Sequence, residues 1–104
     1  MTPLHNETET RFSTALARVA RHANTAVLCA LAAGPRRQTE LLDELPTLSE
    51  SVLGGSLREL DADKLVARRV DPGPPLRVLY ELTPLGASLA GSLRALREWA
   101  KRQA

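Results

Sequence analysis

Hydrophobic positions recur at helical spacing near the start of the chain. Residues 7–22 repeat apolar side chains along one side of a helix: Phe12, Ala15, Leu16 and Val19. Residues 25–33 (TAVLCALAA) are apolar on nearly every side. This pattern predicts a buried helix of about two turns that ends at Gly34-Pro35. Residues 1–6 are polar and are predicted to form a loose arm.

Two shorter helices are predicted next. Thr39 can cap a helix over residues 39–45 (TELLDEL), which Pro46 ends. Ser49 can cap the following helix, and Glu50 in its first turn suits the helix dipole. The inner side of that second helix carries Val52, Leu53, Leu57 and Leu60. The pattern therefore gives two short helices joined by a tight connection.

A hairpin and a long helix complete the chain. Residues 65–70 and 76–82 are rich in Val and Leu with partial alternation, which predicts two strands. Residues 71–75 (DPGPP) form the extended tip between them. Thr83-Pro84 then starts a helix that runs to near Arg102. Its apolar stripe is longer than one small domain can cover, so a second subunit is expected to bury part of it: Leu85, Leu89, Leu93, Leu96 and Trp99.

This order of elements predicts a mainly α fold with a small β-hairpin, a winged helix-turn-helix. The chain forms one domain, residues 1–104. Residues 34–82 are expected to bind DNA, and residues 7–33 and 84–102 to hold the dimer together. The second short helix would enter a DNA groove while the hairpin tip lies along the phosphates.

Composition and charge limit the other function classes. No apolar run approaches the ~20 residues that span a bilayer, and the polar N-terminus is not a signal peptide. The single Cys29 excludes an internal disulfide and favours a cytoplasmic protein. No phosphate loop, metal-ligand cluster or paired nucleophile and base is present, so neither catalysis nor a cofactor is expected. The net charge is +2, yet residues 34–80 hold seven basic and eight acidic side chains, so a DNA surface requires the charges to be sorted by face.

Candidate DNA contacts flank the second short helix and the hairpin. Arg58 is the candidate base contact, because a guanidinium can pair bidentately with guanine. Its alternative is an ion pair with neighbouring acids: Glu59, Asp61 or Asp63. Ser49 and Ser51 lie at the helix start and suit phosphate, with plain capping as the alternative. The candidates for phosphate contact lie before the first short helix and beside the hairpin: Arg36, Arg37, Arg68, Arg69 and Arg77.

Two adjacent glycines interrupt the predicted reading helix. Gly54 and Gly55 each cost about 1 kcal/mol relative to Ala in a helix interior. Either tertiary packing compensates for this cost, or a partner needs to approach the backbone there. Gly55 is therefore included among the candidate DNA contacts.

A small apolar effector is a possible ligand between the terminal helices. Its candidate pocket is formed by apolar side chains and the cysteine: Phe12, Leu16, Cys29, Leu93 and Trp99. The alternative is that these residues form plain dimer core. Cys29 lies in a run that is apolar all round, so it is expected to be buried and unreactive.

Three blocks of this sequence resemble the HxlR branch of the MarR-like winged-helix regulators. The first is Leu48-Ser49-x-x-Val52-Leu53-x-x-x-Leu57-Arg58-Glu59-Leu60, and the second is Leu65-Val66-x-Arg68. The third is Pro74-Pro75-x-Arg77-Val78-x-Tyr80-x-Leu82-Thr83-x-x-Gly86, followed by Leu96-x-x-Trp99. The resemblance covers roughly residues 25–100. It implies a winged helix-turn-helix dimerised through its first and last helices. This homodimer would bind double-stranded DNA at a palindromic operator and regulate nearby genes, more often as a repressor.

The chain departs from the family pattern at three places. Arg21, His22 and Ala23 replace the Gly-Lys-Trp run of the family. The sensor cysteine of redox-responsive members has no counterpart ahead of the second helix. Gly54, Gly55 and Ser56 replace longer polar side chains on the reading helix. These glycines keep an alternative function open, a protein-interaction module with a winged-helix fold and weak or no DNA binding.

Overall fold

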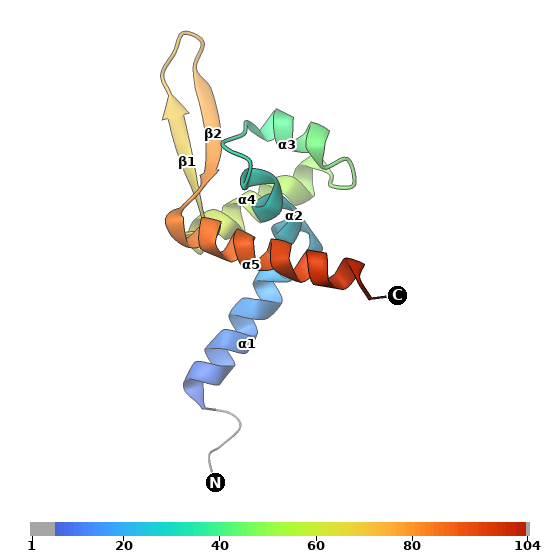
Figure 1. Cartoon of the computed structure of the whole chain (residues 1–104). Coiled ribbons are helices and arrows are strands. Elements are labelled where there is room, and N and C mark those ends of the chain that lie inside the picture. The colour runs from blue at the N-terminus through green and yellow to red at the C-terminus, as the bar shows by residue number, and fades with distance from the viewer. Residues whose placement is uncertain (1–5, 104) are drawn as a thin grey trace.

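The computed structural model describes residues 6–103, so most of the predicted N-terminal arm lies outside the described residues. The elements follow in the order α1 (Glu7–Val19), α2 (His22–Leu31), α3 (Gln38–Glu44), α4 (Glu50–Ala62), β1 (Val66–Asp71), β2 (Arg77–Leu82) and α5 (Pro84–Lys101) (Figure 1). The predicted mainly helical chain with one antiparallel hairpin is confirmed.

Side-chain caps define the starts of three helices. The Ser49 hydroxyl accepts the Val52 N–H at 3.1 Å, and the Thr83 hydroxyl accepts the Gly86 N–H at 3.0 Å. Both predicted caps are therefore confirmed. Asn6, which was assigned to the arm, instead caps α1 by accepting the Glu9 N–H at 2.8 Å.

The predicted start of α3 is wrong by one residue. The helix begins at Gln38, and Thr39 lies within it rather than capping it. The Arg37 N–H donates to the Glu40 carboxylate at 2.8 Å, which satisfies the backbone donor at the helix start. This backbone hydrogen bond also holds the pKa of Glu40 below its ordinary value.

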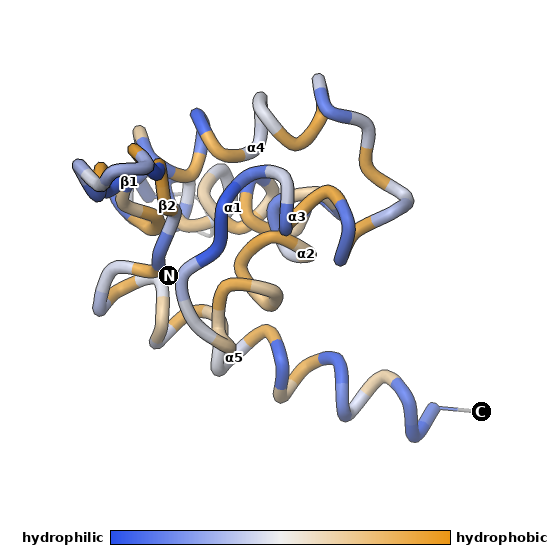
Figure 2. The backbone as a smooth tube through the Cα atoms, turned by 90° about the horizontal axis from the view of Figure 1, so that it is seen from above, coloured by the Kyte–Doolittle hydropathy of each residue, from blue (hydrophilic) through white to orange (hydrophobic). Residues whose placement is uncertain are grey.

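The hydrophobic core lies around α2. Figure 2 shows α2 as a largely hydrophobic segment between α4 and α5. Leucine and valine side chains from α2 and α4 provide most of the core: Val27, Leu28, Leu31, Leu53, Leu57 and Leu60. Ala90 packs against this cluster from α5, and Val66 from β1. The packing holds α4 against α2 through one side and leaves its other side to solvent.

Polar contacts join α4 to the turn between α1 and α2. Inside the core, the Ser56 hydroxyl donates to the Asn24 side-chain oxygen at 2.6 Å. The Asn24 amide donates to the Arg18 carbonyl at 2.8 Å. Outside the core, Arg18 pairs with Asp63 at 2.9 Å and Arg21 pairs with Glu59 at 2.8 Å. The end of α1 is thereby tied to α4 at several points.

The hairpin has a register that places alternate residues on opposite faces. Across the two strands, Val66 pairs with Leu82, Arg68 with Tyr80 and Asp71 with Arg77, and the two members of each pair share a face. The backbone of Arg36 bridges to Tyr80 through two hydrogen bonds of 3.0 and 2.8 Å. This bridge anchors the base of the hairpin beside α3.

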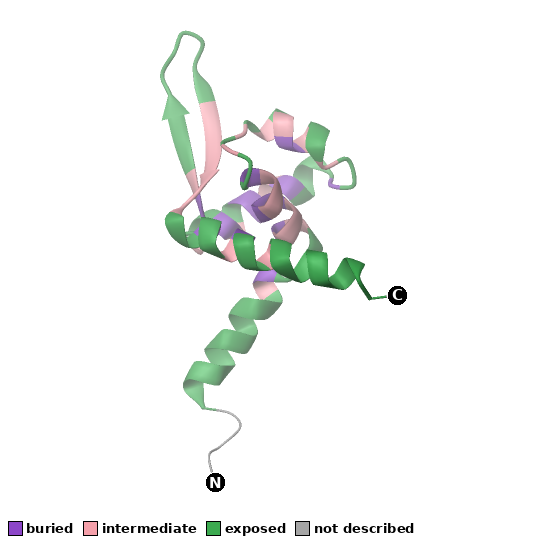
Figure 3. Cartoon of the chain, viewed as in Figure 1, coloured by how far each residue is buried: buried purple, intermediate pink, exposed green. Residues whose placement is uncertain are grey.

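Helix α1 and the end of α5 project from the body of the molecule (Figure 3). Several large apolar side chains along α1 and α5 are more than half exposed: Phe12 (60%), Leu16 (51%), Leu85 (63%), Leu96 (57%) and Trp99 (58%). The stripe on α5 is thus only partly covered by the chain itself. Across residues 6–103, no helix combines the length and the apolarity that crossing a bilayer requires.

The end of α4 carries a strained residue. Lys64 adopts φ 60°, in the left-handed region, and is exposed. The Leu65 N–H reaches back to the Leu60 carbonyl at 3.0 Å, as in a helix end that normally uses glycine. We expect Lys64→Gly to raise the free energy of unfolding by about 1 kcal/mol in urea denaturation, because a β-carbon is disfavoured at this φ. Lys64→Ala keeps the β-carbon and is the control; an equal gain in that variant would contradict the explanation.

Candidate nucleic-acid interface

One side of α4 remains available for a partner. Leu53, Ser56, Leu57 and Leu60 are buried, while Ser51 and Arg58 are exposed. Gly55 lies between these two exposed residues along the helix and is half-buried. The outward side of the predicted reading helix is therefore Ser51, Gly55 and Arg58.

Two acidic side chains at the end of α4, Glu59 and Asp63, are paired away from this outward side, whereas Asp61 lies in the same hollow as Arg58. Arg18 and Arg21 bind Glu59 and Asp63 on the side that faces the turn between α1 and α2. Within residues 6–103, Arg58 forms no ion pair, so the alternative of a local pair with its acidic neighbours is wrong. Arginines from outside the motif thus offset the acidic balance that the sequence shows over residues 34–80.

The two glycines of α4 are not required by packing inside the chain. A β-carbon at Gly54 would lie 3.4 Å from the Arg58 Nη1 and 3.8 Å from the Gln38 Nε2. A β-carbon at Gly55 would meet only the Arg58 Nη2, at 3.9 Å. These are ends of flexible side chains at ordinary contact distances, so tertiary packing does not explain the pair. The glycines instead leave a bare surface beside Arg58.

The arginines of the hairpin lie on opposite faces of it. Arg68 shares a face with Tyr80, and both line a hollow of about 230 Å³ together with Gln38 and Arg58. Arg69 lies on the other face and pairs with Glu81 at 3.3 Å. Sequence reasoning missed Gln38 and Tyr80, because only the fold brings them beside Arg58.

The two arginines before α3 are engaged within the fold to different degrees. The Arg36 Nε lies 2.7 Å from the Glu44 carboxylate, and its Nη1 donates to the Gly34 and Pro35 carbonyls. Its side chain is only 24% exposed. The Arg36 guanidinium is thus engaged within the fold, and we leave this residue out of the DNA surface proposed below. Arg37 pairs with Glu40 at 3.4 Å but stays half exposed.

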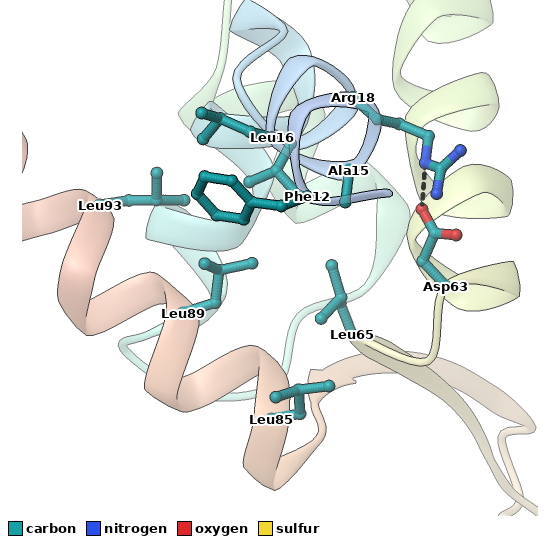
Figure 4. Close-up of a pocket in the computed structure, with 10 residues that line it drawn as sticks. Phe12, Ala15, Leu16, Arg18, Asp63, Leu65, Leu85, Leu89 and Leu93 are labelled. Atoms are coloured by element: carbon teal, nitrogen blue, oxygen red, sulfur yellow. Dashed lines mark ion pairs between the residues drawn. The ribbon is translucent and has the colours of Figure 1, made fainter. Parts of the chain in front are cut away.

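An apolar groove of about 340 Å³ separates α1 from α5 (Figure 4). Phe12 and Leu16 reach into it from α1, while Leu85, Leu89 and Leu93 line it from α5. The Arg18–Asp63 ion pair lies at its edge. Three of the five predicted effector-pocket residues, Phe12, Leu16 and Leu93, thus meet in one place.

The other two predicted effector-pocket residues lie elsewhere. Cys29 lines a separate hollow with Glu44 and Arg97, and it is half-buried rather than buried. The expectation of burial is wrong because the core takes Val27, Leu28 and Leu31 from α2 and leaves the side of Cys29 partly open. Trp99 is exposed on the projecting end of α5. Among residues 6–103, no three His, Cys, Asp or Glu side chains gather as metal ligands would.

Residues 19–104 match the family model described as HxlR-like helix-turn-helix. The HTH-type transcriptional regulator YodB of Bacillus subtilis (strain 168) is 32% identical over 77 residues, which span 74% of this chain and 69% of that protein. An uncharacterized HTH-type transcriptional regulator of Methanothermobacter thermautotrophicus (strain Delta H) is 41% identical over 75 residues, 72% of this chain and 57% of its length.

Solved structures of such regulators share the whole fold. The reduced form of YodB from B. subtilis superimposes with a TM-score of 0.81 at 27% identity, covering 100% of this chain and 95% of that one. The redox regulator HypR in its oxidized form gives a TM-score of 0.81 at 26% identity, over 90% of this chain and 97% of that one. These similarities match the winged-helix architecture described above.

Proposed function

Because the chain belongs to the HxlR-like helix-turn-helix family, we propose that it is a sequence-specific DNA-binding regulator of transcription, and that it represses genes by binding a palindromic operator as a homodimer. The observation that carries the proposal is the outward side of α4. Arg58 lies there without an ion pair among the described residues, and two of its three acidic neighbours, Glu59 and Asp63, are paired with Arg18 and Arg21.

The proposed DNA surface combines α4 with the hairpin. Helix α4 enters the major groove with its outward side, and the hairpin lies along the backbone. The residues assigned to this surface are the predicted ones without Arg36: Arg37, Ser49, Ser51, Gly55, Arg58, Arg68 and Arg77. The Ser49 oxygen accepts the Val52 N–H as a cap, which leaves the hydroxyl hydrogen able to donate to a phosphate.

Binding is tested by fluorescence anisotropy with duplexes enriched from a random pool by the protein and with unselected duplexes. We expect tighter binding to the enriched DNA, and a logarithmic salt dependence with a slope of about −0.9 per neutralised phosphate. Gly55→Glu places a carboxylate on the outward side of α4 and is expected to weaken binding to both duplexes by tenfold or more. Gly91→Glu is the matched control, because a side chain at Gly91 on α5 has nothing within 4 Å.

A protein that binds neither duplex at low salt would overturn the proposal. That result would favour the alternative, a winged-helix interaction module without DNA binding. Equal binding by Gly55→Glu and the parent would instead place the DNA surface elsewhere on the fold.

The proposed homodimer is supported by the exposed apolar surface of α1 and α5. A partner subunit that covers this surface would bury the stripe that one chain leaves open. The groove between α1 and α5 is also our proposed place for a small apolar effector, because its lining is almost wholly apolar. Such a ligand would act by binding more tightly to one of two states of the dimer that differ in the distance between the two α4 helices.

A further inference from the structure

The hollow between α3, α4 and the hairpin gathers donors from three separate parts of the chain. Gln38 comes from the start of α3, Gly54 and Arg58 from α4, and Arg68 from β1. Tyr80 forms part of the wall, directly across the hairpin from Arg68. The volume is about 230 Å³, which is ample for a phosphate group.

The Arg58 guanidinium lies beside the bare backbone of Gly54, at the edge of this hollow. Its Nη1 lies 3.4 Å from the place that a β-carbon of residue 54 would take. The Gln38 Nε2 lies 3.8 Å from the same place. The guanidinium of Arg58 therefore lies back along α4 over the bare backbone, and the Gln38 amide is directed to the same spot.

The charges around the hollow favour an anion. Within residues 6–103, neither Arg58 nor Arg68 has a carboxylate within 4.0 Å. Asp61 is the acid on the wall, and Lys64 adjoins it in the neighbouring hollow with Arg68. Positive charge thus exceeds negative charge at this place, and two guanidiniums that share an opening are stabilised by an anion that both can bind.

We propose that this hollow is a site for one DNA backbone phosphate, bound jointly by Arg58 and Arg68 with the Gln38 amide as a neutral donor. The proposal rests on the DNA-binding function above and reassigns Arg58 from a base contact to a backbone contact. Because the site joins α4 to the hairpin, it fixes how deeply α4 lies in the groove. Sequence preference then comes from the Ser51–Gly55 side of α4 and from DNA shape.

The test compares Arg58→Gln, Arg68→Gln and the double variant with the parent, on enriched and unselected duplexes across a salt series. We expect each single variant to bind both duplexes about tenfold more weakly, and the salt slope to fall by about one in the double variant, which leaves the shared phosphate without an arginine. The double variant should lose less than the product of the single losses, because both arginines bind the same phosphate. Thermal unfolding of every variant checks that the fold is retained.

Asp61→Asn is expected to change the affinity for DNA in the direction opposite to the two arginine variants. Removal of the only carboxylate on the wall is expected to strengthen binding to both duplexes, which a purely structural role of Asp61 would not produce. Arg102→Gln, an exposed arginine at the end of α5, is the control and is expected to bind as the parent does.

A duplex with single neutral methylphosphonates identifies the phosphate. A methylphosphonate at one position in each half-site should weaken DNA binding by the parent and leave DNA binding by the double variant unchanged. If Arg58→Gln changes the ranking of sequences while Arg68→Gln does not, Arg58 reads a base and the phosphate site is wrong. If the parent binds DNA and both variants bind equally well, this site alone fails; if the parent binds no DNA, the proposed function fails with it.

Discussion

We expect Gly86→Ala to lower the free energy of unfolding by about 3 kcal/mol or more. Gly86 is buried in the first turn of α5, where the helix packs against Leu65 in the segment between α4 and β1. A β-carbon there would lie 2.9 Å from the Leu65 carbonyl carbon and closer still to its oxygen. The obstacle is backbone, and it is held in place because the Leu65 carbonyl accepts the Thr83 N–H at 3.1 Å. The Thr83 hydroxyl also donates to the Lys64 carbonyl at 2.8 Å, so the two segments cannot separate without losing both bonds.

Gly91→Ala is the control for this prediction, because Gly91 lies in the same helix with open space around its Cα. That change is expected to stabilise the protein by up to about 1 kcal/mol through helix propensity. Urea denaturation at one fixed protein concentration measures both variants, since assembly would otherwise shift the midpoint. Similar midpoints for the two variants would contradict the close contact between α5 and Leu65.

The second expected result concerns assembly. We expect the parent to sediment as a dimer at micromolar concentration and Leu96→Glu to sediment as a monomer. Leu96 is 57% exposed in the single chain, so a carboxylate there costs the monomer little while it would be buried in the proposed interface. Loss of the dimer should weaken operator binding by about a hundredfold or more, because two half-sites are no longer bound together.

Ala87→Glu tests whether charge alone produces the effect. Ala87 is exposed on the side of α5 opposite Leu96, and a carboxylate near a helix start is favourable. This variant is expected to remain a dimer. A monomeric parent, or a dimeric Leu96→Glu variant, would place the contact between subunits elsewhere.

The elements of the fold could be predicted because their signals are local. Ser49 and Thr83 cap helices at the expected positions, and Pro84 starts α5. The start of α3 was misplaced because the relevant hydrogen bond joins the Arg37 backbone to the Glu40 side chain, and Thr39 offered a plausible but unused hydroxyl. Local patterns thus predicted the order of elements, but the break between the first two helices comes earlier than expected: α1 ends at Val19 and α2 already begins at His22.

Features that depend on neighbours from other elements could not be predicted in the same way. The apolar run around Cys29 indicated burial, but only the packed fold shows that α3 and α5 leave this side of α2 partly open. From the sequence, Arg58 could equally pair with nearby acids, and only the structure shows that Arg18 and Arg21 bind two of them, Glu59 and Asp63. Gln38 carried no signal, because its proximity to Arg58 depends on the angle between α3 and α4.

The hydrogen bond between Ser56 and Asn24 gives this core a property that its leucines do not provide. Leucine side chains on neighbouring helices can interdigitate in several closely related registers at similar energy. A hydrogen bond of 2.6 Å tolerates much less sliding or rotation, and both partners are almost fully buried. This one polar contact therefore selects a single orientation of α4 against α2, where a purely apolar interface would allow several. Replacing both Ser56 and Asn24 by apolar residues is therefore expected to preserve the melting temperature while α4 takes up more than one orientation relative to α2.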